Sequence, residues 1–149
     1  MTRRIAIVGA GYTGKRLAEQ AVGRGWEVVG TTRSEETLAE LEAIGATGRR
    51  WDVLEDEADE LADDFAGADA VVYSIPTLYR DYEPGDGERP RHVGPVERTL
   101  DAAIEAGAGR FIYLSSTSVY GDHGGAWVDE ETPTDPVSPF GKMRREIEE

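Results

Sequence analysis

Short apolar runs alternate with amphipathic stretches along this chain of 149 residues. Runs rich in β-branched and aliphatic residues, bounded by polar or glycine positions, predict strands. The predicted strands are residues 4–8, 27–32, 47–51, 69–75 and 110–114. Between them, apolar residues recur every three or four positions, which predicts helices that each bury one face. The predicted helices are residues 12–22, 35–44, 54–66, 93–106 and a last one from about 140.

The apolar residues also indicate which face of each helix turns inward. In the first predicted helix, the inward residues are Leu17, Ala18, Ala21 and Val22. In the helix at 93–106, they are Val93, Val96, Leu100 and Ile104.

Strands that alternate with helices predict a parallel sheet with right-handed crossovers and helices on both faces. The fold class is therefore α/β, a Rossmann-type doubly wound sheet in three layers with the strand order 3-2-1-4-5. The length suits one domain over residues 1–149, which we interpret as a nucleotide-binding domain.

The first strand runs directly into Gly9-Ala10-Gly11-Tyr12-Thr13-Gly14. In a strand–turn–helix, Gly9 permits a tight turn, Gly11 lets a pyrophosphate approach the backbone, and Gly14 lets the helix pack against the strand. The first amides of the helix, at the positive end of its dipole, would face the phosphates. This arrangement indicates a dinucleotide site, and a purely structural glycine-rich turn is the alternative.

The residues after the second strand bear on which dinucleotide binds. An NAD site usually has an acidic residue there for the ribose 2′-hydroxyl, but this stretch reads Thr31-Thr32-Arg33-Ser34. Arg33 could instead pair with a 2′-phosphate through two charge-assisted hydrogen bonds. We therefore predict NADP in preference to NAD; a solvated surface role for Arg33 is the alternative.

Composition excludes some classes of function. The net charge is −14, from 30 acidic and 16 basic residues, which disfavours nucleic-acid binding. The chain has no cysteine and only two histidines, so it offers little material for a metal site. No apolar run is long enough for a membrane span or a signal peptide, and we expect a cytoplasmic protein. Only two of the basic residues are lysines, and this composition is typical of a halophilic protein; an acidic protein from a GC-rich genome is the alternative.

One segment carries a specific resemblance. The fifth strand and its continuation read Phe111-Ile112-Tyr113-Leu114-Ser115-Ser116-Thr117-Ser118-Val119-Tyr120-Gly121. This resembles the Ser-Ser-x-x-Val-Tyr-Gly segment of the extended short-chain dehydrogenases/reductases, which include NAD-dependent epimerases and dehydratases. The glycine turn, Asp52-Val53, Ser74-Ile75-Pro76 and Glu131-Thr132-Pro133 also match that family, so the resemblance covers nearly the whole chain.

The resemblance implies roles for individual residues. Those implied for the cofactor are Gly9, Gly11, Tyr12, Thr13 and Gly14 at the pyrophosphate, Asp52 and Val53 at the adenine, and Ser74, Ile75 and Pro76 along the path to the ribose. Ser116, four residues before Tyr120, matches the family's catalytic Ser/Thr, which polarises a substrate carbonyl or alcohol. Strand termination is the alternative role for Ser116.

The family's Tyr-x-x-x-Lys acid/base pair is not matched. One register places Phe140 at the Tyr and Arg144 at the Lys, and the other places Ser138 and Lys142 there. Neither Phe nor Ser replaces a phenol of lowered pKa. Other phenols are Tyr120, Tyr79 and Tyr82, the last two in a long segment at 76–91 that we interpret as functional or disordered. We expect His123 to be solvated, and Arg144 or Lys142 to bind ribose or phosphate, or simply to pair with Glu146 or Glu148.

The leading hypothesis is an NAD(P)-binding oxidoreductase, epimerase or dehydratase domain that lacks the family's C-terminal substrate region. The alternatives are a non-catalytic NAD(P)H sensor and, more remotely, an FAD- or sugar-nucleotide-binding module. The resemblance also implies a homodimer through the helix at 93–106.

Overall fold

The computed structural model describes residues 2–76 and 93–149. The chain divides into two compact units. The first contains the residues up to Pro76 together with Glu97–Leu114, and the second contains Ser115–Glu149 together with the described residues 93–96. The segment at 76–91, with Tyr79 and Tyr82, falls almost wholly outside the described residues.

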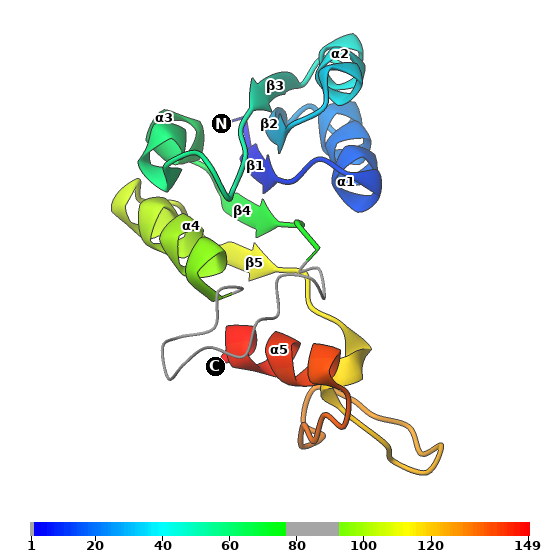
Figure 1. The fold of residues 1–149 in the computed structure, drawn as a ribbon. Helices are drawn as coiled ribbons and strands as arrows, with labels where there is room; N and C mark the ends of the chain where they lie inside the picture. The colour runs from blue at the N-terminus through cyan, green and yellow to red at the C-terminus, as the bar shows by residue number, and fades with distance from the viewer. Residues whose placement is uncertain (1, 77–92) are drawn as a thin grey trace. The chain divides into compact units, whose positions relative to one another are not determined.

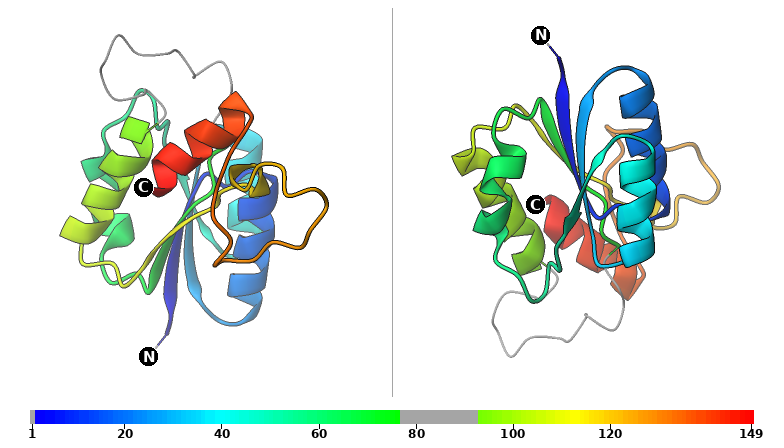
Figure 2. Two further views of the ribbon diagram at one scale, coloured as in Figure 1. Left: turned by 90° about the horizontal axis from the view of Figure 1, so that it is seen from below. Right: turned by 90° about the horizontal axis from the view of Figure 1, so that it is seen from above.

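The first unit is built on a five-stranded parallel sheet with the order β3-β2-β1-β4-β5, as predicted (Figure 1). Its strands are β1 (Arg4–Val8), β2 (Glu27–Thr32), β3 (Thr47–Arg50), β4 (Ala70–Tyr73) and β5 (Phe111–Tyr113). Its helices are α1 (Tyr12–Gly23), α2 (Glu35–Ala43), α3 (Ala62–Phe65) and all but the first four residues of α4 (Val93–Glu105). Helices α1 and α2 cover one face of the sheet, and α3 and α4 lie on the other (Figure 2). The Rossmann-type three-layer prediction is confirmed.

The core of this unit explains why the central strands β1 and β4 are so apolar. Ile7 pairs with Gly30 of β2 on one side and Val72 of β4 on the other, and it is fully buried. A strand covered on both faces reads as a continuous apolar run because both sets of side chains are shielded from water. Ala18 and Ala21 of α1 complete the cluster on one face, as predicted, with Leu17 and Val22 partly buried beside them.

Two predictions about helices are confirmed only in part. The predicted helix at 54–66 is a short 3-10 turn, Ala58–Leu61, followed by the single turn of α3, and Leu54 is exposed. In α4, Val93 and Val96 are buried as predicted and Leu100 is half-buried, but Ile104 is 64% exposed. Toward the end of the helix, the smaller Ala102 and Ala103 are buried instead.

The second unit contains a 3-10 turn, η3 (Thr117–Val119), and the helix α5 (Pro139–Glu148). Ser138 caps α5, because its hydroxyl accepts a hydrogen bond of 3.0 Å from the amide of Gly141. A Cβ on Gly141 would collide with the carbonyl oxygen of Ser118, so η3 and α5 pack at van der Waals distance. Among the helices of the described chain, none has the length and hydropathy needed to cross a membrane.

Candidate cofactor site

The turn after β1 has the geometry that the first glycine was predicted to allow. Gly9 has a φ of +92°, and a Cβ there would lie 2.5 Å from Cγ1 and 3.1 Å from the amide nitrogen of Ile75. A side chain would therefore meet both a backbone penalty and a collision with the segment that follows β4. The prediction that Gly9 permits the tight turn is confirmed.

The other two glycines differ from each other. A Cβ on Gly14 would lie 2.5 Å from the carbonyl oxygen of Gly9 and 3.1 Å from Cγ2 of Ile7, so its absence lets α1 pack on β1. A Cβ on Gly11 would have no neighbour within 4 Å in the described chain. Gly14 is thus required by packing, and Gly11 faces open space, as expected of a position that leaves room for a ligand.

The N-terminus of α1 is open to an anion. Gly11 is its N-cap residue, and within the described residues no side chain caps this end and no acidic residue lies in the first turn. The first amides of a helix need a partner, and the helix dipole favours a negative one. Tyr12 is 76% exposed and begins the helix at this point. These residues fit a pyrophosphate.

Thr31 of β2 fixes this turn and was missed in the sequence analysis. Its hydroxyl accepts a hydrogen bond of 2.9 Å from the amide of Gly9, and its carbonyl accepts one of 2.7 Å from the amide of Ala10. Thr31 itself is buried. The signal was present in the sequence, since a hydroxyl residue closes the otherwise apolar run Val28-Val29-Gly30.

A pocket of about 160 Å³ lies beside this turn, at the carboxyl ends of the strands, and we call it the switch-point pocket. Parallel sheets bind ligands where neighbouring strands connect in opposite directions, which in this order is at β1 and β4. Seven predicted residues line it: Gly9, Gly11, Arg33, Val53, Ser74, Ile75 and Pro76. Its other lining residues are Ala10, Thr31, Thr32 and Trp51, and the predicted Tyr12, Thr13, Gly14 and Asp52 are outside the lining.

Trp51 and Val53 form one wall of this pocket, and hydrogen bonds to residues outside the pocket hold them in place. The indole nitrogen of Trp51 donates to the carbonyl of Glu57 at 3.1 Å, and the ring is buried. Arg98 of α4 donates to the carbonyl of Val53 at 3.3 Å. The signal for this wall in the sequence is a lone large aromatic residue just before Asp52, and Trp51 is not among the predicted site residues.

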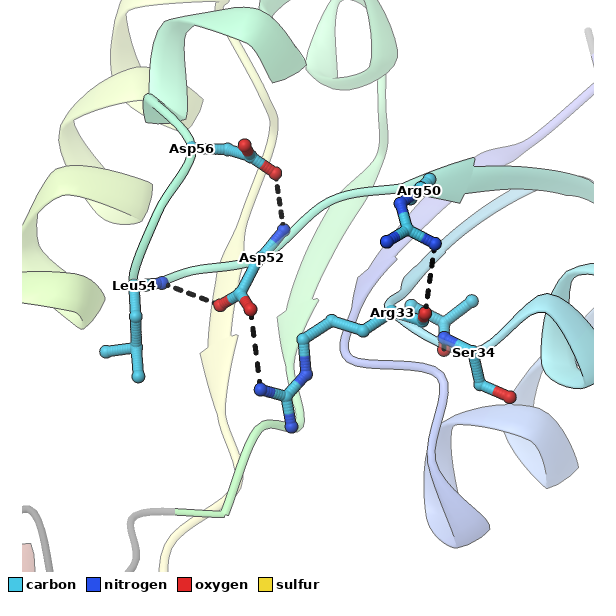
Figure 3. A network of polar contacts seen from close by, with 7 residues as sticks. Arg33, Ser34, Arg50, Asp52, Leu54 and Asp56 are labelled. Atoms are coloured by element: carbon cyan, nitrogen blue, oxygen red, sulfur yellow. Dashed lines mark hydrogen bonds and ion pairs between the residues drawn. The ribbon is translucent and has the colours of Figure 1, made fainter.

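Arg33 reaches from the end of β2 toward Asp52, which follows β3 (Figure 3). Its guanidinium nitrogen lies 3.4 Å from Oδ2 of Asp52, and 64% of the Arg33 side chain is exposed. On the other side, Arg50 donates to the Arg33 carbonyl at 3.4 Å and pairs with Glu35 at 2.7 Å. Arg50 therefore contacts the backbone from which the Arg33 side chain projects.

In the second unit, Ser116 lines a separate hollow of about 430 Å³, which we call the hydroxyl-rich hollow. Its lining residues are Ser115, Ser116, Thr117, Val119, Tyr120, Glu130, Thr132, Thr134 and Glu148. The Ser116 hydroxyl accepts a hydrogen bond of 3.2 Å from the Ser118 amide and caps η3, which is a structural role. It also borders space that a small molecule can enter.

The residues at the positions of the missing acid/base pair lie on α5. The guanidinium carbon of Arg144 lies 5.0 Å from the centre of the Phe140 ring, and Arg144 is buried. Lys142, in contrast, is exposed. His123 is half-buried, and its Nε2 lies 2.8 Å from the Tyr120 carbonyl, so its ring is only partly solvated.

A Rossmann-type sheet with a glycine-rich turn and an uncapped helix at its switch point defines a nucleotide-binding α/β protein. Residues 9–145 match the family described as NAD(P)H-binding, and the chain belongs to that family. It is 36% identical to the protein YeeZ of Escherichia coli K12 over 99% of this chain and 52% of that protein, so the chain spans about half the length of this relative.

Solved structures of epimerases share the fold. The UDP-Glc/GlcNAc 4-epimerase of Campylobacter jejuni superposes with a TM-score of 0.79 at 19% identity, over 98% of this chain and 47% of that one. The UDP-glucuronic acid 4-epimerase of Bacillus cereus, in complex with UDP-glucuronic acid and NAD, gives 0.73 at 23% identity, over 97% and 50%. The structural neighbours therefore include members of the epimerase and dehydratase group.

Proposed function

We propose that this chain is the NADP(H)-binding domain, over residues 1–149, of an oxidoreductase, epimerase or dehydratase. The observation that carries the proposal is the Gly9–Gly14 turn, which leads into an uncapped α1 beside the switch-point pocket. Nicotinamide dinucleotides carry a pyrophosphate that needs such amides. The matched family supports the cofactor class, and Arg33 at the pocket supports the choice of NADP(H) over NAD(H).

Each predicted residue has a place in this proposal. The backbone of the turn at 9–14, including Tyr12 and Thr13, binds the pyrophosphate. Asp52 and Val53 lie against the adenine, and Ser74, Ile75 and Pro76 line the way to the nicotinamide ribose. Arg33 pairs with the 2′-phosphate, because its planar guanidinium can donate two hydrogen bonds to phosphate oxygens.

When bound, the cofactor supplies or accepts a hydride. The substrate we propose is a carbonyl compound or a nucleotide-sugar-like molecule, on the basis of the sequence resemblance and of the UDP-sugar named for the Bacillus cereus epimerase. Ser116 borders the hydroxyl-rich hollow and would donate a hydrogen bond to the substrate oxygen. Its hydroxyl has only one hydrogen to donate, and its lone pairs also serve the Ser118 amide.

A second function is favoured by one observation. Position 140 carries a Phe ring stacked with Arg144, and neither side chain can exchange a proton near neutral pH. A protein that binds NADPH as a sensor or regulator, without turnover, needs the glycine turn and no acid/base pair. The two functions share the cofactor site and differ in chemistry alone.

The experiment that tests the proposal is a calorimetric titration of the chain with NADPH, NADH and FAD in high-salt buffer. NADPH binding that is tighter than NADH binding supports the site and the role of Arg33, and preferential FAD binding contradicts both. Turnover of a carbonyl panel by the full-length protein, lost in Ser116→Ala, favours the enzyme. Binding of NADPH without turnover favours the sensor.

A further inference from the structure

Asp52 places a fixed negative charge beside the arginine proposed to hold the 2′-phosphate. Its Oδ2 lies 3.4 Å from the guanidinium of Arg33, and its side chain is 21% exposed. Arg33 comes from the end of β2 and Asp52 from the end of β3, which are neighbouring strands. An NAD site usually has an acidic residue at the end of the second strand, and this chain has none there. Asp52, at the end of β3, places a carboxylate in the same region.

The position of Asp52 does not depend on Arg33. Its Oδ1 accepts a hydrogen bond of 3.0 Å from the amide of Leu54, and its own amide donates one of 2.7 Å to Asp56 (Figure 3). These bonds belong to the turn that follows β3, and neither of them involves the arginine. The carboxylate is therefore a preset feature of the site.

Arg33, in contrast, is held loosely by Asp52. A distance of 3.4 Å is long for a charge-assisted hydrogen bond, which is usually about 2.7–2.9 Å. The arginine side chain is mostly exposed, and exposed ion pairs contribute little to stability. A phosphate can therefore replace Asp52 as the partner of Arg33, but it then lies close to the same carboxylate.

We propose that Asp52 is a specificity-determining residue that opposes Arg33 and limits the preference for NADPH over NADH. This inference rests on the proposed function, because it assigns the 2′-phosphate to Arg33. The Asp52 carboxylate competes with the 2′-phosphate of NADPH for the Arg33 guanidinium, and it also repels that phosphate. NADH has no 2′-phosphate, so its binding is not weakened in this way. The parent protein accordingly binds both cofactors, with a moderate preference for NADPH.

The test is the ratio of the dissociation constants for NADH and NADPH in the folded protein and in Asp52→Asn. The amide oxygen of Asn can still accept the bond from Leu54, so the turn is kept. We expect Asp52→Asn to raise the NADH-to-NADPH ratio by about three- to tenfold at low salt, mainly through tighter NADPH binding. Because adenine is common to both cofactors, any change at the adenine cancels in this ratio.

Asp56→Asn is the matched control. It removes one negative charge from the same turn, and Asp56 is bonded to the Asp52 amide and not to Arg33. We expect its ratio to stay within about twofold of the parent. In 1 M KCl the effect of Asp52→Asn should shrink, since the Debye length falls to about 3 Å.

Three outcomes separate failure of this inference from failure of the proposed function. An unchanged ratio in Asp52→Asn, with a parent preference for NADPH that Arg33→Ala abolishes, overturns the inference and keeps the function. A lower ratio, through weaker NADPH or tighter NADH binding, also overturns it. A parent protein that shows no preference dependent on Arg33 overturns the assignment of the 2′-phosphate and the inference with it.

Discussion

The amide of Gly9 donates a hydrogen bond of 2.9 Å to the hydroxyl of Thr31, which ties the turn after β1 to the end of β2. The carbonyl of Thr31 holds the next amide, that of Ala10, at 2.7 Å. One buried residue of the neighbouring strand thus fixes two amides of the glycine-rich turn. The shape of the turn is set by this contact as well as by its own glycines.

We predict that Thr31→Val destabilises the protein by about 1–2 kcal/mol, because the amide of Gly9 loses its acceptor. NADPH binding should weaken as well, since the turn is less well ordered. Urea denaturation and calorimetric titration measure the two effects. Thr31→Ser keeps the hydroxyl and should restore most of the binding; a Ser variant as weak as the Val variant would show that the methyl group, not the hydrogen bond, is what matters.

Alanine at the first two glycines of the turn should have different effects, mainly on stability at Gly9 and mainly on NADPH binding at Gly11. Gly9→Ala meets a positive φ and a contact of 2.5 Å with Ile75, so we expect a loss of about 2–4 kcal/mol of stability. Gly11→Ala has open space around its Cβ, so it should cost less than about 1 kcal/mol but weaken NADPH binding about tenfold. Thermal unfolding and titration of both variants test this. Normal NADPH binding by a folded Gly11→Ala would contradict a pyrophosphate site at this turn.

Much of this architecture could be predicted from the sequence because the fold is encoded by local patterns. β2 has the predicted bounds, and the strand order follows from alternation and the handedness of crossovers. The buried face of α4 was predicted correctly at Val93 and Val96 but not at its end, since Ile104 fits helical spacing as well as Ala103 does. Only tertiary packing decides between two faces with the same period.

The site was predicted in part for a related reason. The glycines are recognisable because a tight turn next to a pyrophosphate requires glycine at fixed spacing after the first strand. Arg33 is recognisable because it stands at the end of the second strand, where an NAD site usually has an acidic residue. Thr31 acts through a contact with Gly9, 22 residues earlier in the chain, and Trp51 donates to Glu57 in the turn that follows it. Their residue types stand out in the sequence, but the sequence does not give the partners that they contact. The pairing of Arg33 with Asp52 likewise depends on the register in which Thr32 lies beside Arg50.

Arg33→Asp should reverse the cofactor preference. The substitution replaces the proposed phosphate ligand with a second carboxylate near Asp52, so NADPH binding should weaken by more than about tenfold. NADH binding should be retained or improved, because a carboxylate can accept a hydrogen bond from the ribose 2′-hydroxyl. Titration with both cofactors measures the change, and unchanged selectivity would rule out Arg33 as the selecting residue.

The acidic composition predicts a stabilising effect of salt. With a net charge of −14, carboxylate repulsion in the folded state should be reduced by screening. We expect the melting temperature to rise between 0.1 and 1 M KCl, with most of the rise at the lower concentrations. A melting temperature that is flat or falls over this range would contradict the halophilic interpretation.

We predict that Phe140→Tyr, which places a phenol beside Arg144, restores proton transfer if the protein is an enzyme. The Phe140 ring already lies 5.0 Å from the guanidinium, so the substitution adds one hydroxyl and keeps the stacked pair. A nearby fixed positive charge favours the phenolate, and the pKa of the new phenol should fall below its ordinary value. If the protein is an enzyme limited by its missing acid, carbonyl reduction with NADPH should rise about tenfold or more.

The matched control for this last prediction is Phe140→Leu, which removes the ring without adding a proton donor and should leave turnover unchanged. NADPH titration of both variants verifies that the cofactor site is retained. A gain specific to Phe140→Tyr, with a pH profile that follows the new phenol, would show that the parent protein has everything for hydride transfer except the proton. Intact NADPH binding with no gain at any pH would instead favour the sensor, because the stacked Phe140–Arg144 pair would then lie in a protein that does not need an acid.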